Sequence, residues 1–491
     1  MAMGKSRRVA IIGAGVSGLG LAIQLQRSGR HDDVVLFEKA SDLGGTWRDN
    51  TYPGAECDVE AELYTFSFEP NPLWSATYPS QAEILAYLEH CATKYDVRRR
   101  IRFNTTIDHI VYDATSRTYL LTTTAGDSET FDVAVSAVGL LHRPFVPEIP
   151  GASTFAGAAF HSAAWDHSVD LRGKRVALVG SAASAIQIGP ALAPIASQLV
   201  LFQRSAHWVI PKSVRRFSST EMWLARRWSC YHRARRWFWY LLRERIVYFV
   251  LWRHYVGWLR VIFACGSQLF LRWHVGDPAT RALLTPSYPF GGKRVLVSDD
   301  YYPMFKRHNV SIESKPIARV MADGLTTTDG AVHKVDAIVF ATGFTPTSFL
   351  TPMGVRGVGG QRLHDAWDGY PHAYLGMQVH GFPNFFMMYG PNTNSAHSSI
   401  VLMSEAQANY IVQCLRALDA QNADVMDVTS EVNGAYQREM ARRCETMIWA
   451  DVAASPYKDA TSGRITTMWP GPMREYVART RSVNVGDYTF G

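Results

Sequence analysis

The sequence predicts an α/β protein with two Rossmann-like dinucleotide-binding domains and a helical insertion. Two observations indicate the domains: a short apolar strand runs into a glycine-containing loop near the N-terminus, and the same arrangement returns 167 residues later. A third observation indicates the insertion, because residues 226–260 hold helix-length apolar stretches without proline. A chain of 491 residues is also too long for one ordinary hydrophobic core, so two or three domains are expected.

The N-terminal segment RRVAIIGAGVSGLG has the form of a strand followed by a dinucleotide-binding loop. Gly13 permits the tight turn, Gly15 lets the backbone approach a pyrophosphate, and Gly18 lets the following helix pack on the strand. The start of that helix offers free N–H groups and a positive dipole end to the phosphates. The next strand, DVVLFEK, ends at Glu38, whose carboxylate would accept hydrogen bonds from ribose hydroxyls. An unrelated glycine turn is the alternative.

The segment GKRVALVGSAASAIQ repeats this arrangement, with Ala182 in place of the second glycine. A methyl group there would push the phosphates slightly outward. The next strand, QLVLFQRS, ends at Arg204, where an NAD site would place its acid. Because an arginine fits a 2′-phosphate, this position selects NADPH over NADH, and a surface arginine at a strand end is the alternative. The expected NADPH contacts are Gly180, Ser181, Ser184, Arg204 and Ser205.

Two further strands resemble each other, FDVAVSAVGLLHRP at 131–144 and VDAIVFATGFTP at 335–346. Each runs from an acidic residue through apolar residues into a turn of small residues and glycine, which indicates a crossing between two nucleotide domains. One site for a flavin and one for NADPH would make the chain a flavin oxidoreductase. The expected domains are a discontinuous FAD-binding domain at 1–150 and 340–491, an NADPH-binding domain at 151–339, and a helical insertion at 213–290 within the latter.

Cysteine usage and charge exclude several classes of protein. The six cysteines are scattered without a CxxC pair, which argues against a disulfide framework, a zinc site and a dithiol redox centre, so we expect no metal and a reduced, cytoplasmic protein. The net charge is +7, but residues 215–275 alone hold 12 Arg, no Lys and 2 Glu, so a diffuse nucleic-acid-binding surface is not expected. The apolar run from Val9 to Leu25 resembles a signal peptide, but its regular glycines favour strand, loop and helix.

The segment FAGAAFHSAAWD carries a specific pattern, with Phe155, Gly157, His161, Trp165 and Asp166 at the positions of an FxGxxxHxxxW-(P/D) signature. With this signature the chain resembles the class B flavoprotein monooxygenases, and among them the Baeyer–Villiger monooxygenases. Simple N- and S-oxidising relatives usually have another aromatic residue in place of the tryptophan and lack the following acid. Four further segments resemble the ketone-oxidising branch, in order: GGTWRDNTYPGAECDVEAELYTFSF, YPFGGKRV, GPNTNSAHSS and TTMWPGPMREY. The resemblance covers nearly the whole chain except part of 215–275.

The resemblance implies that the signature segment is a hinge element between the two domains, with His161 near the NADPH site. Its role would be to couple the position of the nicotinamide to the state of the flavin. A structural linker with a satisfied, buried His161 is the alternative.

The resemblance also implies a wall around the isoalloxazine ring that excludes water, because a leaky site releases H₂O₂ instead of product. Its expected residues are Gly45, Thr46, Trp47 and Tyr64. Residues 392–397, with Trp469 and Pro470, would line the far side of the flavin and the substrate entrance, although core packing explains Trp469 equally well.

The implied reaction is an NADPH- and O₂-dependent conversion of a ketone to an ester or lactone. NADPH reduces FAD, and reduced FAD forms with O₂ a C4a-peroxyflavin that must stay deprotonated to attack the carbonyl. A fixed cation lowers the pKa of the peroxide, and Arg294 would supply it because arginine keeps its proton. Asp58 would orient Arg294, and Lys293 would join Arg204 on the 2′-phosphate. The alternatives are an ordinary basic turn for Lys293 and Arg294, and a loop-capping acid for Asp58.

The arginine- and tryptophan-rich segment allows two interpretations. Its arginines interrupt the apolar stretches too often for a membrane span, which needs about 18 uncharged apolar residues. It is either a helical insertion that covers the substrate pocket or an amphipathic face on anionic lipid, with peripheral membrane contact through 215–275. Either suits a bulky, lipophilic ketone and leaves the oligomeric state open.

Two other functions remain as alternatives. One is the oxygenation of nitrogen or sulfur, in which a protonated hydroperoxide attacks an amine or sulfide. The other is a membrane-docked flavin-binding protein without turnover, which only Ala182 and the basic insertion favour.

Overall fold

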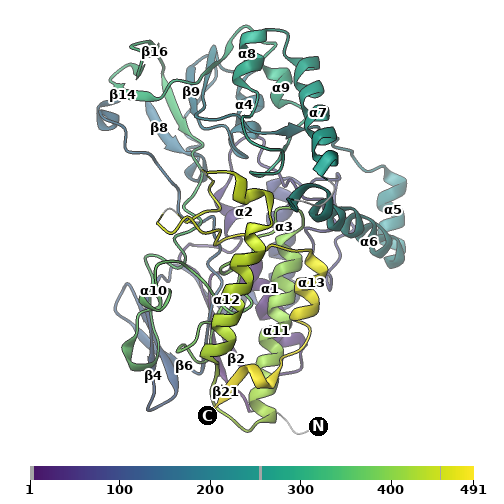
Figure 1. Ribbon diagram of the computed structural model, residues 1–491, viewed down its shortest axis with the longest axis vertical. Helices are drawn as coiled ribbons and strands as arrows, with labels where there is room; N and C mark the ends of the chain where they lie inside the picture. Colours follow the sequence, from purple (N-terminus) through teal and green to yellow (C-terminus); the bar gives the residue numbers. More distant parts are fainter. Residues whose placement is uncertain (1–4, 254–256, 454, 460) are drawn as a thin grey trace.

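Two parallel sheets organise the chain in this computed structural model, which describes residues 5–253, 257–453, 455–459 and 461–491 (Figure 1). The first sheet, in the lower half of Figure 1, has the strand order β19-β7-β1-β2-β3. Its strands are β1 (Arg8–Ile12), β2 (Asp33–Phe37), β3 (Ile101–Arg102), β7 (Val133–Ser136) and β19 (Phe385–Met387). β1 pairs in parallel with β2 and β7, and β19 joins from the far end of the sequence. This half of the molecule is therefore built from two separate stretches of chain.

The second sheet, in the upper half of Figure 1, has the strand order β13-β10-β9-β17-β8. Its strands are β8 (Ala158–His161), β9 (Arg175–Val179), β10 (Gln198–Phe202), β13 (Val310–Glu313) and β17 (Ala337–Phe340). Every pairing in it is parallel, as expected when helices connect successive strands. The two sheets confirm the predicted α/β class.

Helices cover both sheets. Beside the first lie α1 (Val16–Arg27), α3 (Gln81–Lys94), α11 (Ile400–Ala420), α12 (Ser430–Glu445) and α13 (Met473–Arg479), and beside the second lie α4 (Ala185–Leu192), α7 (Gly257–His274), α8 (Pro278–Leu283) and α9 (Tyr301–Met304). Helix α1 follows β1 directly and packs along α11, so that Leu19 and Ile411 share one core with Ile11. The second core joins Leu178 of β9 to Leu271 of α7.

Smaller sheets, mostly antiparallel, lie beside the two main sheets. One sheet contains β4 (Ile107–Asp113), β5 (Thr118–Thr123), β6 (Ser128–Phe131) and β18 (Gly354–Arg356), and another contains β14 (Ile317–Met321), β15 (Gly324–Thr327) and β16 (Val332–Lys334). The short pairs are β11 (Val209–Ile210) with β12 (Leu296–Val297) and β20 (Met426–Val428) with β21 (Tyr488–Phe490). Within these sheets β18 pairs with β4, and β11 with β12, in parallel. Short helices α2 (Thr46–Asp49) and α10 (Leu363–Ala366) complete the lower half.

The two connections between the halves run side by side. Pro144 and Phe344 form an antiparallel bridge, the Phe145 N–H donates to the Gly343 carbonyl at 2.8 Å, and the Thr345 N–H donates to the Arg143 carbonyl at 3.2 Å. Both segments belong to the strand-and-turn stretches that the sequence marks as crossings. The chain therefore leaves and re-enters the first half through one paired linker.

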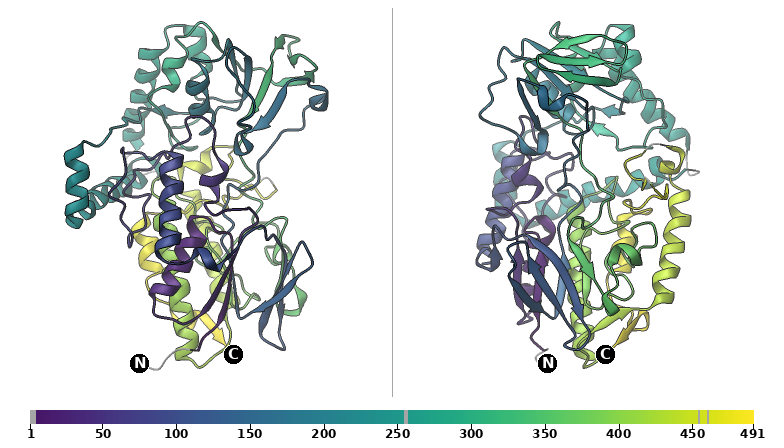
Figure 2. Two further views of the ribbon diagram at one scale, coloured as in Figure 1. Left: turned by 180° about the vertical axis from the view of Figure 1, so that it is seen from behind. Right: turned by 90° about the vertical axis from the view of Figure 1, so that its left-hand side faces the viewer.

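The helical insertion divides between the two halves. It comprises α5 (Ser219–Arg227), α6 (Ser229–Ile246), a π-helical turn (Val247–Leu251), α7 and α8. Helix α7 packs on the second sheet's core, but α6 contacts the loop at 58–69 that belongs to the first half. Because buried ion pairs fix α6 there, the insertion bridges both halves and does not belong to the second alone. Helices α5 and α6 project from the body of the molecule, as the front view and the back view both show (Figures 1 and 2).

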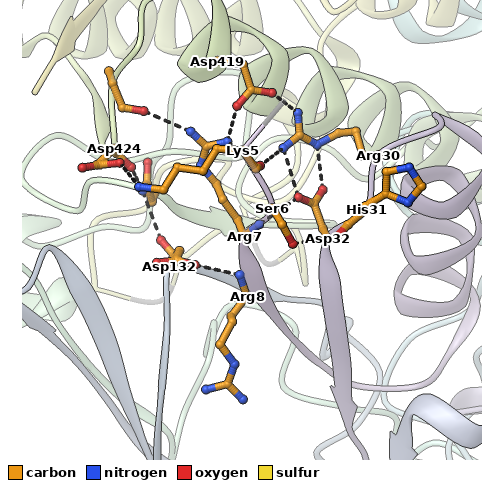
Figure 3. A network of polar contacts seen from close by, with 12 residues as sticks. Lys5, Ser6, Arg7, Arg8, Arg30, His31, Asp32, Asp132, Asp419 and Asp424 are labelled. Carbon is orange, nitrogen blue, oxygen red and sulfur yellow. Dashed lines mark hydrogen bonds and ion pairs between the residues drawn. The ribbon is translucent and has the colours of Figure 1, made fainter. Parts of the chain in front are cut away.

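Ion pairs anchor the N-terminal strand (Figure 3). Arg7, buried at the start of β1, forms an ion pair with Asp419 at the end of α11, and Arg30 joins Asp419 to Asp32. The Arg7 guanidinium also donates to the Ala423 carbonyl at 3.0 Å. The apolar run that follows forms β1, the glycine loop and α1, as predicted.

Within the described ranges, no helix is both long and apolar enough to cross a bilayer. In the same residues, no group of three or more His, Cys, Asp or Glu side chains could hold a metal ion.

Candidate active site

The glycine loop after β1 leaves a bare backbone surface. A Cβ on Gly18 would lie 1.9 Å from the Gly13 carbonyl oxygen, and one on Gly45 would lie 3.1 Å from Gly15 Cα. Gly15 is the N-cap of α1 and offers no capping side chain, so the first N–H groups of the helix have no side-chain acceptor there. Gly13, Gly15, Gly18 and Gly45 thus form one cradle at a helix N-terminus, the arrangement that binds a pyrophosphate.

Glu38 lies at the end of β2, beside this cradle. Its side chain is buried, and its two oxygens accept hydrogen bonds from the N–H groups of Ala14 and Ala40, at 2.9 and 3.0 Å. The Arg48 guanidinium lies 3.2 Å from one oxygen, a contact that the sequence patterns did not predict. The carboxylate is therefore held at the mouth of the loop, where a ribose would be bound.

Thr46, Trp47 and Tyr64 lie together beside Gly45. Helix α2 begins at Thr46, and Trp47 Nε1 donates to the Tyr64 hydroxyl at 2.8 Å. The two rings meet edge to face, with centroids 5.5 Å apart. Burial raises the pKa of Tyr64 well above its ordinary value, so the phenol stays protonated. The pair forms a rigid aromatic wall.

Arg294 and Asp58 form a bidentate ion pair, although they come from different halves of the sequence. The Arg294 Nε donates to one carboxylate oxygen at 2.9 Å, and Nη2 donates to the other at 2.6 Å. Nη1 makes no hydrogen bond to any described residue. The Arg294 side chain is 43% exposed, so a ligand can reach part of it.

The charges of this pair stabilise each other. Burial alone would raise the pKa of Asp58, but Arg294, aided by Arg243 and Lys212, holds it below its ordinary value. The Asp58 carboxylate in turn raises the pKa of Arg294 far above its ordinary value. Both groups therefore stay ionised throughout the physiological range.

Two tyrosines that the sequence motifs did not identify lie near this pair. Tyr389 has a positive φ of 58° and donates its hydroxyl to Asn394 Oδ1 at 2.7 Å. Burial raises the pKa of Tyr457 to about 12, while the charge of Arg294 opposes that shift. The positive charge of Arg294 likewise acts on Tyr389 against the effect of burial. Neither tyrosine lies in a recognisable motif, so only the fold brings them to Arg294.

The second glycine loop, after β9, has the predicted geometry at its first position. Gly180 has a φ of +128°, and a Cβ there would lie 2.2 Å from the Ala341 carbonyl oxygen. The Ser181 hydroxyl donates to the Ser205 carbonyl at 3.0 Å, and Ser184 is the N-cap of α4 without a side-chain capping bond. Gly180, Ser181, Ser184 and Ser205 therefore lie around one helix N-terminus.

Arg204 and Lys293 provide two cations beside this loop. Neither has an ion-pair partner among the described residues. Burial lowers the pKa of Lys293, and the charge of Arg204 lowers it further. The Lys293 ammonium instead lies 4.9 Å from the centroid of the Tyr288 ring. Arg204 and Lys293 repel each other, and no carboxylate of the described residues pairs with either. An anionic ligand would relieve this repulsion, so the pair indicates an anion site.

The signature segment is the edge strand β8 and the turn after it. His161 pairs with Phe340 in the second sheet and packs edge to face on Phe344, which belongs to the paired linker. Its Nδ1 accepts the Ala163 N–H at 3.0 Å, and burial lowers its pKa. Nε2 is buried and has no hydrogen-bond partner of good geometry among the described residues, and hydrogen bonding to the Gly343 backbone opposes the lowering of the pKa. These contacts fit both a coupling role and a buried structural histidine.

The loop at 390–399 pairs with the segment at 465–469. The Asn392 N–H donates to the Thr466 carbonyl at 2.7 Å, and the Trp469 N–H donates to the Asn394 carbonyl at 2.9 Å. Trp469 itself is fully buried and packs edge to face on Tyr476. Of the two readings of Trp469, the structure favours core packing.

A cavity of about 270 Å³ lies between α12 and the segment 458–465. Tyr370, Tyr436, Cys444 and Arg464 are among its lining residues, which include neither Arg294 nor any residue of the glycine loops. The cavity is therefore separate from the Arg294–Asp58 pair.

Comparisons with known proteins agree with this geometry. A family model described as flavin-binding monooxygenase-like matches residues 6–239. A Baeyer–Villiger monooxygenase of Streptomyces coelicolor is 40% identical over 483 residues, covering 98% of this chain and 92% of the relative. A solved steroid monooxygenase bound to NADP is 30% identical, with a TM-score of 0.86 and 99% of both chains covered. The OTEMO complex with FAD and NADP is 27% identical, with a TM-score of 0.89, and covers 99% of this chain and 100% of its own.

Proposed function

This chain belongs to the Baeyer–Villiger monooxygenases, and from that premise we propose that its Arg294–Asp58 pair serves the conversion of a lipophilic ketone to an ester or lactone. The enzyme depends on FAD and NADPH. The observation that carries the proposal is a bidentate, permanently charged Arg294 whose Nη1 makes no hydrogen bond to any described residue and whose side chain is 43% exposed. The same premise favours ketone oxidation over oxygenation of nitrogen or sulfur and over a flavin-binding protein without turnover.

The residues of the first half fit FAD. The cradle of Gly13, Gly15 and Gly18 would hold its pyrophosphate at the N-terminus of α1, and Glu38 would accept from its ribose. Gly45, Thr46, Trp47 and Tyr64 would wall off its ring. When bound and reduced by NADPH, the flavin supplies the activation of O₂.

Arg294 supplies a fixed positive charge for the oxygen transfer. A guanidinium favours the deprotonated form of an oxygen nucleophile beside it, and that form attacks a ketone carbonyl. Asp58 holds Nε and Nη2, so the orientation of the guanidinium is fixed and Nη1 stays unpaired among the described residues. Because the pKa of Arg294 is raised further, the charge cannot be lost during turnover.

The second half fits NADPH. The loop of Gly180, Ser181 and Ser184, with Ser205, would hold the pyrophosphate, and Arg204 with Lys293 would bind the 2′-phosphate. The unpaired cations support this assignment, since a 2′-phosphate would relieve their repulsion. From the positions of the two glycine loops we assign FAD binding to residues 1–150 and 340–491 and NADPH binding to residues 151–339. The helical insertion, 213–290, lies within the second range.

His161 fits the role of coupling the position of the nicotinamide to the state of the flavin. It connects the edge of the second sheet to Phe344 in the paired linker, and its ring also lies close enough to the Gly343 backbone of that linker for hydrogen bonding to affect its pKa. A shift of the linker would therefore change its surroundings directly.

The test is NADPH oxidation by the purified holoenzyme against a panel of linear, cyclic and steroid-sized ketones, with product masses measured. A gain of one oxygen as an ester or lactone, with apolar ketones turned over best, supports the proposal. Oxygenation of sulfides and amines but of no ketone in the panel would contradict it.

A further inference from the structure

Helix α6 turns its charged residues inward. Arg243 donates to both oxygens of the buried Glu60, at 3.0 and 2.8 Å. Arg236 donates to the carbonyls of Glu62 and Thr65, each at 2.6 Å, and lies 3.2 Å from Glu405. Arg235 forms an ion pair with Glu62. These three arginines hold the helix on the first half of the molecule.

The opposite face of α6 is apolar and faces solvent. Trp237 is 65% exposed, and Phe238 and Leu242 beside it are also exposed. Arg233 and Arg245 flank them on the same face. A surface helix of a globular protein normally buries its apolar stripe and exposes its charges, so this helix is inverted.

Helix α7 also exposes an apolar face. Trp258, Ile262, Leu269 and Trp273 are exposed and follow one another at helical spacing along one face. Trp273 is 79% exposed, the largest value among the exposed apolar residues described. A monomeric protein rarely leaves apolar stripes of this kind uncovered.

The charges around these faces indicate what covers them. Arg226, Arg227, Arg233, Arg245 and Arg272 are exposed and have no ion-pair partner among the described residues. The two glutamates of 215–275 are already used, because Glu221 caps α5 and binds Arg215, and Glu244 is buried against the N–H group of Met473. The outer surface therefore combines tryptophans with arginines and offers no free carboxylate from this segment.

We propose that the outer faces of α6 and α7 dock on an anionic lipid bilayer. Tryptophan suits the interface between headgroups and acyl chains, and arginine suits anionic headgroups. A second copy of the chain fits this surface less well, because its arginines would face arginines of the other copy with no acid between them. Helices α5 and α6 also project from the body of the molecule (Figure 2). The proposal does not depend on which ketone the enzyme oxidises.

The experiment is flotation of the holoenzyme with vesicles of phosphatidylcholine, with and without phosphatidylserine. We expect flotation with phosphatidylserine at low salt and its loss at about 1 M salt, where the screening length is about 3 Å. Replacing Arg233 and Arg245 by glutamine should weaken binding by roughly 30-fold, at about 1 kcal/mol for each arginine. Trp237→Ser with Phe238→Ser should abolish it.

The matched control is Val332→Ser, which removes another exposed apolar side chain, on β16 of the second half. It should float as the unaltered enzyme does. Absence of flotation at low salt overturns the proposal, and so does equal flotation of the control and the Trp237 Phe238 variant. A mass in light scattering that doubles through Trp237 and Phe238, without vesicle binding, overturns it in favour of a dimer. NADPH oxidation by each variant separates a failed docking surface from a failed enzyme.

Discussion

Arg294 and Asp58 lie 236 positions apart in the sequence, and the guanidinium donates to both carboxylate oxygens through Nε and Nη2. This leaves Nη1 without a hydrogen bond to any described residue. The bond pattern restricts the direction of that nitrogen. The geometry makes Arg294 the positioned cation and Asp58 its support, and the two roles can be separated by substitution.

Replacing Arg294 by alanine should lower the kcat of ketone oxygenation by about 10²- to 10³-fold, the effect of removing one positioned donor. Bound NADPH should still be oxidised, with H₂O₂ as the product, because neither glycine loop is touched. The mass of the ketone product and the amount of H₂O₂ are measured in the same reaction, with one ketone at a time. Arg172→Ala, at an exposed arginine paired with Asp170, is the control and should match the unaltered enzyme. Full ketone turnover by Arg294→Ala would refute its assigned role.

Asp58→Asn should lower kcat while leaving the KM for NADPH unchanged, because Arg294 keeps its charge but loses its orientation. The pH dependence follows from the lowered pKa of Asp58. The contribution of the pair is present above the ordinary pKa of an aspartate, about 4, and is lost only as the pH falls through the lower folded value. We therefore expect no acid limb from this group in kcat between about pH 5 and 8. An acid limb in that window that disappears in Asp58→Asn would contradict the assignment.

Arg204→Ala should raise the KM for NADPH by about 10- to 100-fold, from the loss of a hydrogen bond to a charged group. The KM for NADH should change little, since NADH carries no 2′-phosphate. Lys293→Ala should act in the same direction, and the double variant should fall short of the product of both effects if they share one phosphate. Steady-state kinetics with both nucleotides measure this. Equal losses with NADPH and NADH would argue against a 2′-phosphate site.

The parts of this molecule that are local in sequence could be predicted, and the parts that depend on distant contacts could not. Gly13, Gly15 and Gly18 predict their loop because the residues that need a tight turn or a close backbone approach all lie within six positions. The pairing of Arg294 with Asp58 was predicted only from the family resemblance, because neither segment contains a pattern that indicates its partner. Tyr389 and Tyr457 could not be predicted, because they belong to no motif and only the fold brings them close to Arg294.

The arginine-rich helix shows the same limit of local reasoning. The pattern of arginines in α6 does not tell which of them face inward, because their partners Glu60, Glu62 and Glu405 lie far away in sequence. The usual pattern of a surface helix, with its apolar stripe buried, would place the tryptophans inside. Buried acids elsewhere in the chain, and not the periodicity of the helix, decide its orientation.

Gly18→Ala should yield a protein that binds little or no FAD. The added Cβ would lie 1.9 Å from the Gly13 carbonyl oxygen, so the loop and the start of α1 must move apart. The flavin-to-protein absorbance ratio of the purified protein measures the effect. Gly276→Ala, where a Cβ meets nothing within 4 Å, is the matched control and should keep its full flavin content. Normal flavin content in both variants would show that the cradle tolerates a methyl group and is not the pyrophosphate site.

Glu60→Ala should destabilise the protein because it leaves the Arg243 guanidinium buried without its partner. Breaking a buried ion pair at one end costs about 3–5 kcal/mol, whereas replacing both partners by apolar residues of similar size is close to neutral. Glu60→Leu with Arg243→Met should therefore recover most of the stability that Glu60→Ala loses. Urea unfolding of the FAD-loaded enzyme, followed by flavin fluorescence and by circular dichroism, measures both. Because Arg243 also donates to the Asp58 carbonyl at 3.3 Å, the double variant should regain stability but not full kcat. Recovery of both would mean that α6 only covers the site, and recovery of neither would mean that the ion pair has a role that packing cannot replace.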